Sequence, residues 1–139
     1  MKNIDIFHSV VGFIFSELYD NIPHEIEIEY SDFHETFPDA QEDDCTPWID
    51  TFNSAIKWLE VEEFIKTNKK SDEAEGFKFM LTGKGMHQLS MLGESKEDKT
   101  IGDLLLEAVE NGNLTKTRQY GKVAIYVSFN TGNSNQRHQ

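Results

Sequence analysis

The change of apolar spacing at Pro23 constrains the fold of this chain more than any other feature. Over residues 6–22, apolar side chains recur every three or four positions, which predicts a helix with one broad buried face. The next residues after the proline, HEIEIEY, place Ile26, Ile28 and Tyr30 on one side and three glutamates on the other. This alternation is typical of a half-buried strand, so the chain is predicted to begin with a helix followed by a strand.

Two further helices are predicted from capping residues and prolines. Ser31 can cap a short helix over SDFHETF, with Glu35 in its first turn and Pro38 at its end. Thr46 followed by Pro47 marks the start of a longer helix, because the hydroxyl satisfies a free amide and proline has none to satisfy. The apolar residues of this third helix form one stripe, which contains Trp48, Phe52, Ala55, Ile56 and Leu59.

The same signals divide the second half of the chain. The alternating stretch FKFML predicts a strand, and Thr82 can cap a fourth helix that ends at Gly93. Thr100 and Asp103 resemble a capping box for a fifth helix, which stops at Gly112.

Residues 114–129 fit two patterns. The stretch VAIYVSF alternates like a strand, but its spacing also fits a helix, and we interpret the segment as helical. The polar residues 131–139 are predicted to form a flexible tail.

Together these elements predict a mainly helical α+β protein with a small antiparallel wing sheet. Its 139 residues are enough to bury one core, and ten Phe and two Trp argue against a disordered chain. No stretch approaches the roughly 20 apolar residues of a membrane span, and the first residues lack the apolar run of a signal peptide. Cys45 is the only cysteine, so no internal disulfide can form. We therefore expect a cytoplasmic protein that does not bind membranes.

Two stretches carry a resemblance to a known fold. The first is AIKWLEVEEFIK, which resembles the end of a recognition helix and its exit into a wing strand. The second is FKFMLTGKGMHQL, which is similar to the passage from the wing into the next helix in MarR-like and PadR-like bacterial regulators. The residues that match this passage are Leu81, Thr82, Lys84 and Gly85. The resemblance implies a winged helix-turn-helix domain over residues 1–92.

Residues 93–130 are then a C-terminal extension, which we predict to be helical and to form a homodimer. Its fifth helix has an apolar face beyond what a winged-helix core of this size should need. The candidate dimerisation residues are Leu104, Leu105, Ala108 and Val109.

The acidic residues are concentrated in one segment. Residues 24–63 contain thirteen of the 25 acidic residues and only Lys57 among the 13 basic ones, so this segment accounts for the net charge of −12. Winged-helix regulators use basic side chains of the third helix and wing to hold phosphates, and an acidic surface there repels a duplex.

The first functional hypothesis is therefore a non-enzymatic regulatory or interaction module that binds a basic protein partner through this acidic region. Trp58 lies off the apolar stripe of the third helix and is expected to be partly exposed. The candidate partner-binding residues are Asp43, Asp44, Asp50, Trp58, Glu62 and Glu63.

The alternative hypothesis is a DNA-binding transcriptional regulator with basic contacts from the wing and a C-terminal arm. The candidate DNA contacts are Lys57, Lys66, Lys69 and Lys70, and the arm would add Lys116, Arg118 and Lys122. Because acidic residues surround most of these lysines, we expect weak or absent DNA binding.

No motif predicts a metal, a cofactor or a catalytic site. His24, His34 and Cys45 lie close to several acids, but none of these residues has the spacing of a zinc site, and EDDC lacks the pattern of a calcium loop. No arrangement for acid–base or nucleophilic catalysis is present in the sequence, so we do not expect an enzyme.

Overall fold

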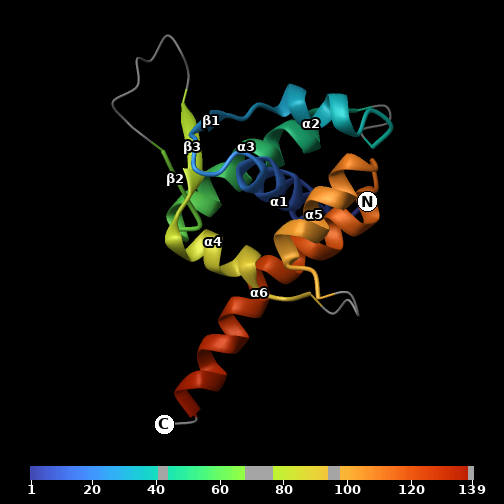
Figure 1. The fold of residues 1–139 in the computed structure, drawn as a ribbon. Coiled ribbons are helices and arrows are strands. Elements are labelled where there is room, and N and C mark those ends of the chain that lie inside the picture. The colour runs from blue at the N-terminus through green and yellow to red at the C-terminus, as the bar shows by residue number, and fades with distance from the viewer. Residues whose placement is uncertain (41–43, 68–76, 94–97, 138–139) are drawn as a thin grey trace.

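The computed structural model describes residues 1–40, 44–67, 77–93 and 98–137, with side chains described as far as residue 126. Within these ranges the chain forms six helices and one three-stranded antiparallel sheet. Figure 1 shows the sheet at one side of the molecule and the helices gathered around a central one. The protein is thus a mainly helical α+β protein, as predicted.

The central element is helix α1 (Asn3–Asp20), which the sequence predicted over residues 6–22. Every residue from 8 to 16 is buried, on all sides of the helix rather than on one face. Helices α3, α5 and α6 and strand β3 all pack against it. Helix α1 is therefore the axis around which the remaining elements are arranged (Figure 1).

Helix α6 (Leu114–Arg137) makes the most extensive packing with α1, and the two cross at glycines. A Cβ atom on Gly12 would lie 2.2 Å from the carbonyl oxygen of Thr117, and one on Gly121 would lie 2.6 Å from that of His8. The helical interpretation of residues 114–129 is confirmed. The helix continues to Arg137, so the prediction of a flexible tail over residues 131–139 is wrong for residues 131–137. A helix that has already nucleated adds each further residue with one hydrogen bond, even where the side chains are polar.

The sheet has the order β1–β3–β2, with β1 (Ile26–Glu27) and β2 (Ile65–Thr67) on either side of β3 (Lys78–Leu81). Ile26 pairs with Phe79, and Ile65 pairs with Leu81. The order α1–β1–α2–α3–β2–β3 with this sheet is compatible with a winged-helix-like arrangement.

Strand β1 is shorter than the sequence predicted because its end is used to start helix α2 (Tyr30–Thr36). Glu29 caps this helix, and its backbone amide donates to the Asp32 carboxylate at 3.0 Å in a capping box. The predicted cap Ser31 and first-turn residue Glu35 are therefore wrong, because the helix starts two residues earlier, with Glu29 as its cap and Asp32 in its first turn.

Helix α3 (Thr46–Val61) begins one residue earlier than its predicted cap, Thr46, implied. Cys45 occupies the cap position, and the amide of Thr46 donates to the Asp44 carboxylate at 3.0 Å. An aromatic cluster ties α1, α2 and α3 together: the Phe33 ring lies 5.4 Å from that of Phe13 and 5.5 Å from that of Trp48.

The predicted caps of the next two helices are confirmed. Thr82 caps α4 (Gly83–Ser90) and Thr100 caps α5 (Ile101–Glu110), each hydroxyl accepting a backbone amide at 3.1 Å. None of the described helices is long and apolar enough to cross a bilayer.

The apolar face of α5 lies inside the chain rather than on its surface. The helix packs against α1 and α6, which leaves Leu104, Leu105 and Ala108 buried and Val109 half-buried against the core. The assignment of these four residues to a dimer interface is therefore wrong, because helix α1 needs α5 to cover it. The segment after Gly93 completes the core instead of extending from it.

Replacing Gly12 or Gly121 by alanine should destabilise the protein by about 3 kcal/mol or more, because the added methyl meets backbone that cannot move away. Urea unfolding followed by circular dichroism measures this loss. Gly83→Ala is the matched control, since nothing lies within 4 Å of its Cβ position. An unchanged unfolding midpoint for Gly121→Ala would show that α1 and α6 do not cross this closely.

Candidate protein-binding surface on helix α3

Helix α3 turns one face to the core and the opposite face to solvent. The buried residues are Trp48, Phe52, Ala55 and Leu59, which recur every three or four positions. The exposed residues on the other side include Pro47, Asp50, Asn53, Ser54, Lys57, Trp58 and Val61. This exposed stripe carries one acid and one base among polar and apolar residues. The exposed face of α3 is therefore less acidic than the segment 24–63 as a whole.

Trp58 is held at the edge of this stripe with part of its ring exposed. Its ring packs edge-on against Phe7 at 5.3 Å and stacks on Phe64 at 6.0 Å. Trp58 is 37% exposed and Trp48 is 5% exposed, which confirms that Trp48 belongs to the core and Trp58 does not. Val61, one turn further, is 70% exposed.

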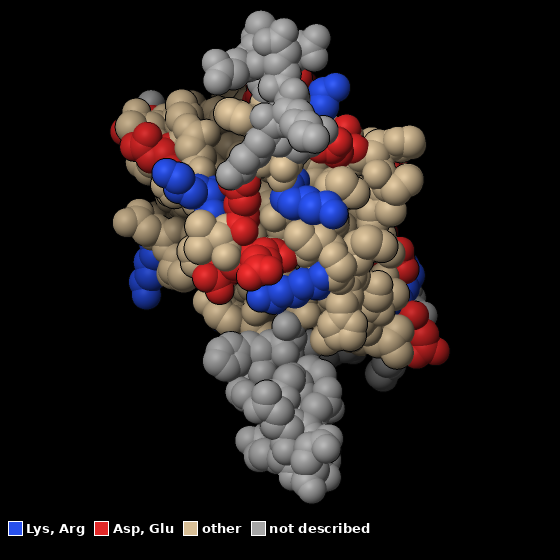
Figure 2. Space-filling model, turned by 90° about the vertical axis from the view of Figure 1, so that its left-hand side faces the viewer, with Lys and Arg blue, Asp and Glu red and all other residues tan. Residues whose placement is uncertain are grey.

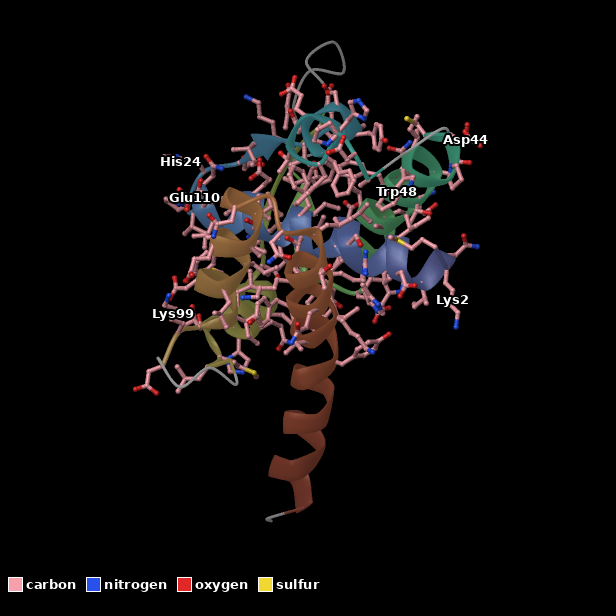
Figure 3. The ribbon with its side chains drawn as sticks, turned by 90° about the vertical axis from the view of Figure 1, so that its right-hand side faces the viewer. Lys2, His24, Asp44, Trp48, Lys99 and Glu110 are labelled. Atoms are coloured by element: carbon pink, nitrogen blue, oxygen red, sulfur yellow. The ribbon has the colours of Figure 1, made fainter. Side chains whose placement is uncertain are left out.

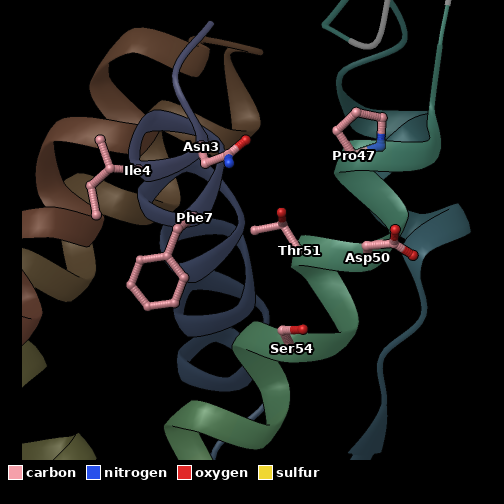
Figure 4. A pocket seen from close by; sticks show the side chains of 7 residues that line it. All are labelled: Asn3, Ile4, Phe7, Pro47, Asp50, Thr51 and Ser54. Carbon is pink, nitrogen blue, oxygen red and sulfur yellow. The ribbon is translucent and has the colours of Figure 1, made fainter.

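A groove of about 500 Å³ runs between the first turns of α1 and the first half of α3. Figure 4 shows its lining, which consists of Asn3, Ile4 and Phe7 from α1 and Pro47, Asp50, Thr51 and Ser54 from α3. Phe7 also contacts the Trp58 ring, so one residue of the groove touches the exposed tryptophan. Sequence reasoning missed this groove because it assigned Phe7 only to the buried face of the first helix.

The acidic residues among the predicted partner-binding residues lie toward the two ends of α3. Asp44 and Asp50 are exposed at its N-terminal end, where Figure 3 labels Asp44 (the start of α3), and Glu62 and Glu63 are exposed directly after its last residue. Asp43 lies outside the described residues. Hydrogen bonds from Thr46 hold the pKa of Asp44 below its usual value, so its carboxylate stays charged next to the positive end of the helix dipole.

Glu63 ends α3 in a strained backbone conformation. Its φ of 66° lies in the left-handed region, where glycine is usual. The amides of Glu63 and Phe64 donate back to the carbonyls of Glu60 and Leu59 at 3.0 and 2.9 Å. A charged side chain thus occupies a position that glycine would fill with less strain, at the edge of the exposed surface.

The wing motif that carries the resemblance is explained by packing around Phe64. Lys84 lies over the Phe64 ring at 4.4 Å and donates to the carbonyl of Glu62 at 2.9 Å. A Cβ on Gly85 would lie 2.2 Å from the carbonyl oxygen of Phe64, so only glycine fits there. The motif therefore joins the end of α3 to the start of α4.

The candidate DNA-binding lysines do not form one basic face in the described part of the chain. Lys57 and Lys66 are exposed on α3 and β2, while Lys69 and Lys70 fall outside the described residues. Figure 2 shows the side of the molecule that carries β2, β3 and α4, where basic and acidic side chains are interspersed. From the predicted arm, Arg118 packs on α1 and donates to the Ser9 hydroxyl at 3.0 Å.

The remaining chemistry of the described residues is that of a folded core. No group of three His, Cys, Asp or Glu residues within the described ranges comes close enough together to hold a metal ion. His8 is buried 3.4 Å from the Tyr126 hydroxyl, and burial lowers the pKa of its imidazole. Comparisons with protein-family models, with curated proteins and with solved structures found no match to this chain.

The two tryptophans should differ in their access to solvent. In a Trp48→Phe variant the remaining Trp58 should emit at longer wavelength and be quenched readily by acrylamide, because part of its ring is exposed. In Trp58→Phe the remaining Trp48 should emit at shorter wavelength and resist quenching. Steady-state fluorescence of both variants tests this, and equal quenching would contradict the assigned positions.

Proposed function

We propose that this chain is a non-enzymatic, winged-helix-like protein that binds a basic protein partner through its α3 surface. The α3 surface comprises the groove between α1 and α3 together with Asp44, Asp50, Trp58, Val61, Glu62 and Glu63. The observation that carries the proposal is the half-exposed ring of Trp58 between an exposed valine and a groove.

Trp58 has the properties of an interface anchor. Tryptophan is enriched among the residues that dominate binding energy, and such residues act best when a rigid setting holds them in place. Phe7 and Phe64 supply that setting, because both rings pack against Trp58. Ile4 and Val61, which are 48% and 70% exposed, extend the apolar area on either side.

The charges around this apolar area favour a basic partner. Asp44 and Asp50 lie at one end of α3 and Glu62 and Glu63 at the other, with Lys57 as the one base of the exposed stripe. Four carboxylates against one lysine attract a partner of positive charge. Such charges affect the association rate and the choice of partner more than the affinity.

A DNA-binding regulator is the second candidate. Lys57 is exposed in the middle of the helix that winged-helix regulators insert into the major groove, and Lys66 is exposed in the adjacent strand. Each contact with a DNA phosphate needs a cationic side chain, and the acidic residues at both ends of α3 repel the phosphates. The same helix therefore favours a protein partner over a duplex.

The position of the partner can be tested by crosslinking. A photoreactive benzoylphenylalanine at Val61 should crosslink a partner in the native host, because this side chain is 70% exposed and lies one turn from Trp58 on the proposed surface. The same group at Glu35, exposed on α2, is the control and should capture little. Equal capture of the same protein from both positions would contradict the proposal.

The charge dependence of that association is measured with two variants of equal net charge. Asp50→Asn with Glu62→Gln should slow association and reduce its salt dependence, while Glu35→Gln with Asp39→Asn should not. All four side chains are exposed, so folding should hardly change. Identical rates for both variants would show that the α3 acids do not steer the partner.

Weak or absent binding to random duplex DNA is expected at physiological salt. Gel-shift titration of the full chain measures it, with Lys57→Ala and Lys66→Ala as variants. Submicromolar binding that weakens steeply with salt and is lost in these variants would instead establish the DNA-binding function.

A further inference from the structure

A second groove, of about 240 Å³, lies between the C-terminal ends of α1 and α5, away from the α3 surface. Its lining consists of Ser16, Glu17, Asp20, Leu106, Val109 and Glu110. Figure 3 shows Glu110, at the end of α5, and Asp44, at the start of α3, on opposite sides of the molecule. The groove therefore combines three carboxylates with an aliphatic wall at a place that the proposed function does not use.

The electrostatic potential in this groove is negative because of its three carboxylates and because of the dipoles of two helices. Helices α1 and α5 end at Asp20 and Glu110, so the negative ends of both helix dipoles meet there. Neither helix has a basic residue in its last turn to offset this. Burial, and to a smaller extent the charges of Asp20 and Asp32, raise the pKa of Glu17.

The hydroxyl of Ser16 is the feature that points to a ligand. Ser16 is fully buried, lines the groove, and has no hydrogen-bond partner among the described residues. Ser9 in the same helix behaves in the usual way, because its hydroxyl donates to the carbonyl of Asp5 at 2.7 Å. A buried hydroxyl without a partner costs free energy, which a ligand that supplies a hydrogen bond would recover.

The ligand that fits is an organic cation rather than a metal ion. The carboxylates do not converge closely enough for a metal, since the described residues contain no such group of three. Several N–H donors on one cation can reach separated carboxylates, and the methylenes attached to it can pack on Leu106 and Val109. The volume suits one such chain and is smaller than a drug-sized site.

We propose that this groove binds an alkylammonium or guanidinium group, with its N–H donors on Glu17, Glu110 and the Ser16 hydroxyl. Its aliphatic chain lies against Leu106 and Val109. The cation belongs either to a small free amine or to a Lys or Arg side chain of a bound protein, and the hydrogen-bonding chemistry is the same.

The test is a titration of the full-length ¹⁵N-labelled chain, followed by amide chemical shifts at constant ionic strength. The probes are cadaverine, as a free diamine, and the blocked tripeptide Gly-Lys-Gly, as a side-chain source. Tetramethylammonium and Mg²⁺ are the control cations, because the first has no N–H donor and the second is a compact ion. We expect saturable shifts at residues 16–20 and 106–110 with at least one of the two probes and with neither control.

Glu17→Gln and Glu62→Gln have equal net charge, so comparing them separates this site from general attraction to an acidic protein. Glu17→Gln should weaken binding about tenfold and Ser16→Ala about threefold, while Glu62→Gln, on the α3 surface, should leave it unchanged. Glu17→Gln should remain folded, because a carboxylate with a raised pKa destabilises the folded state once it ionises. This destabilisation is absent below the unfolded pKa and grows as the pH rises through the folded one.

The probe that binds identifies the source of the cation. Binding of cadaverine alone assigns the groove to a free amine, and binding of the peptide assigns it to a partner side chain. The proposal is overturned if neither probe gives saturable shifts at these residues, if tetramethylammonium or Mg²⁺ produces the same shifts, or if Glu17→Gln binds as tightly as Glu62→Gln.

Discussion

The close crossing of α1 and α6 is the contact on which the rest of this structure depends. Gly12 and Gly121 remove the side chains from both helices where they meet, so the two backbones touch. Polar pairs lie beside this contact, with Arg118 donating to Ser9 and the buried imidazole of His8 next to Tyr126. Together with the packing of α3, α5 and β3, this crossing buries α1 on all sides along its middle.

The crossing also determines which surfaces stay open. Because α6 and α5 cover one side of α1, the other side is left for α3 and β3. Aromatic rings from α2, led by Phe33, complete that second side. Helix α3 then has its outer face free, and its first turns diverge from α1 enough to leave a groove. The same packing brings the C-terminal ends of α1 and α5 together, which concentrates negative charge at a second position.

The candidate surface was predictable in part. Trp58 could be separated from Trp48 because helical periodicity places them on different sides of α3. The acidic segment was visible as composition, but it does not form one acidic helix face, since α3 exposes Asp50 and Lys57 together. Ile4 and Phe7 line the groove only because α3 packs beside α1. No local pattern in the sequence indicates that these two helices are neighbours.

Local rules determined the helix starts at Thr82 and Thr100, because a hydroxyl and an amide three residues apart need no distant partner. They also determined the order of elements. For residues 114–129 the local pattern fits both a strand and a helix, and the structure has the helix α6, packed against α1. Only the tertiary structure decided that the apolar face of α5 covers the chain's own core. An apolar face shows that a helix must be covered, but the covering residues lie far along the chain, and periodicity carries no information about which they are.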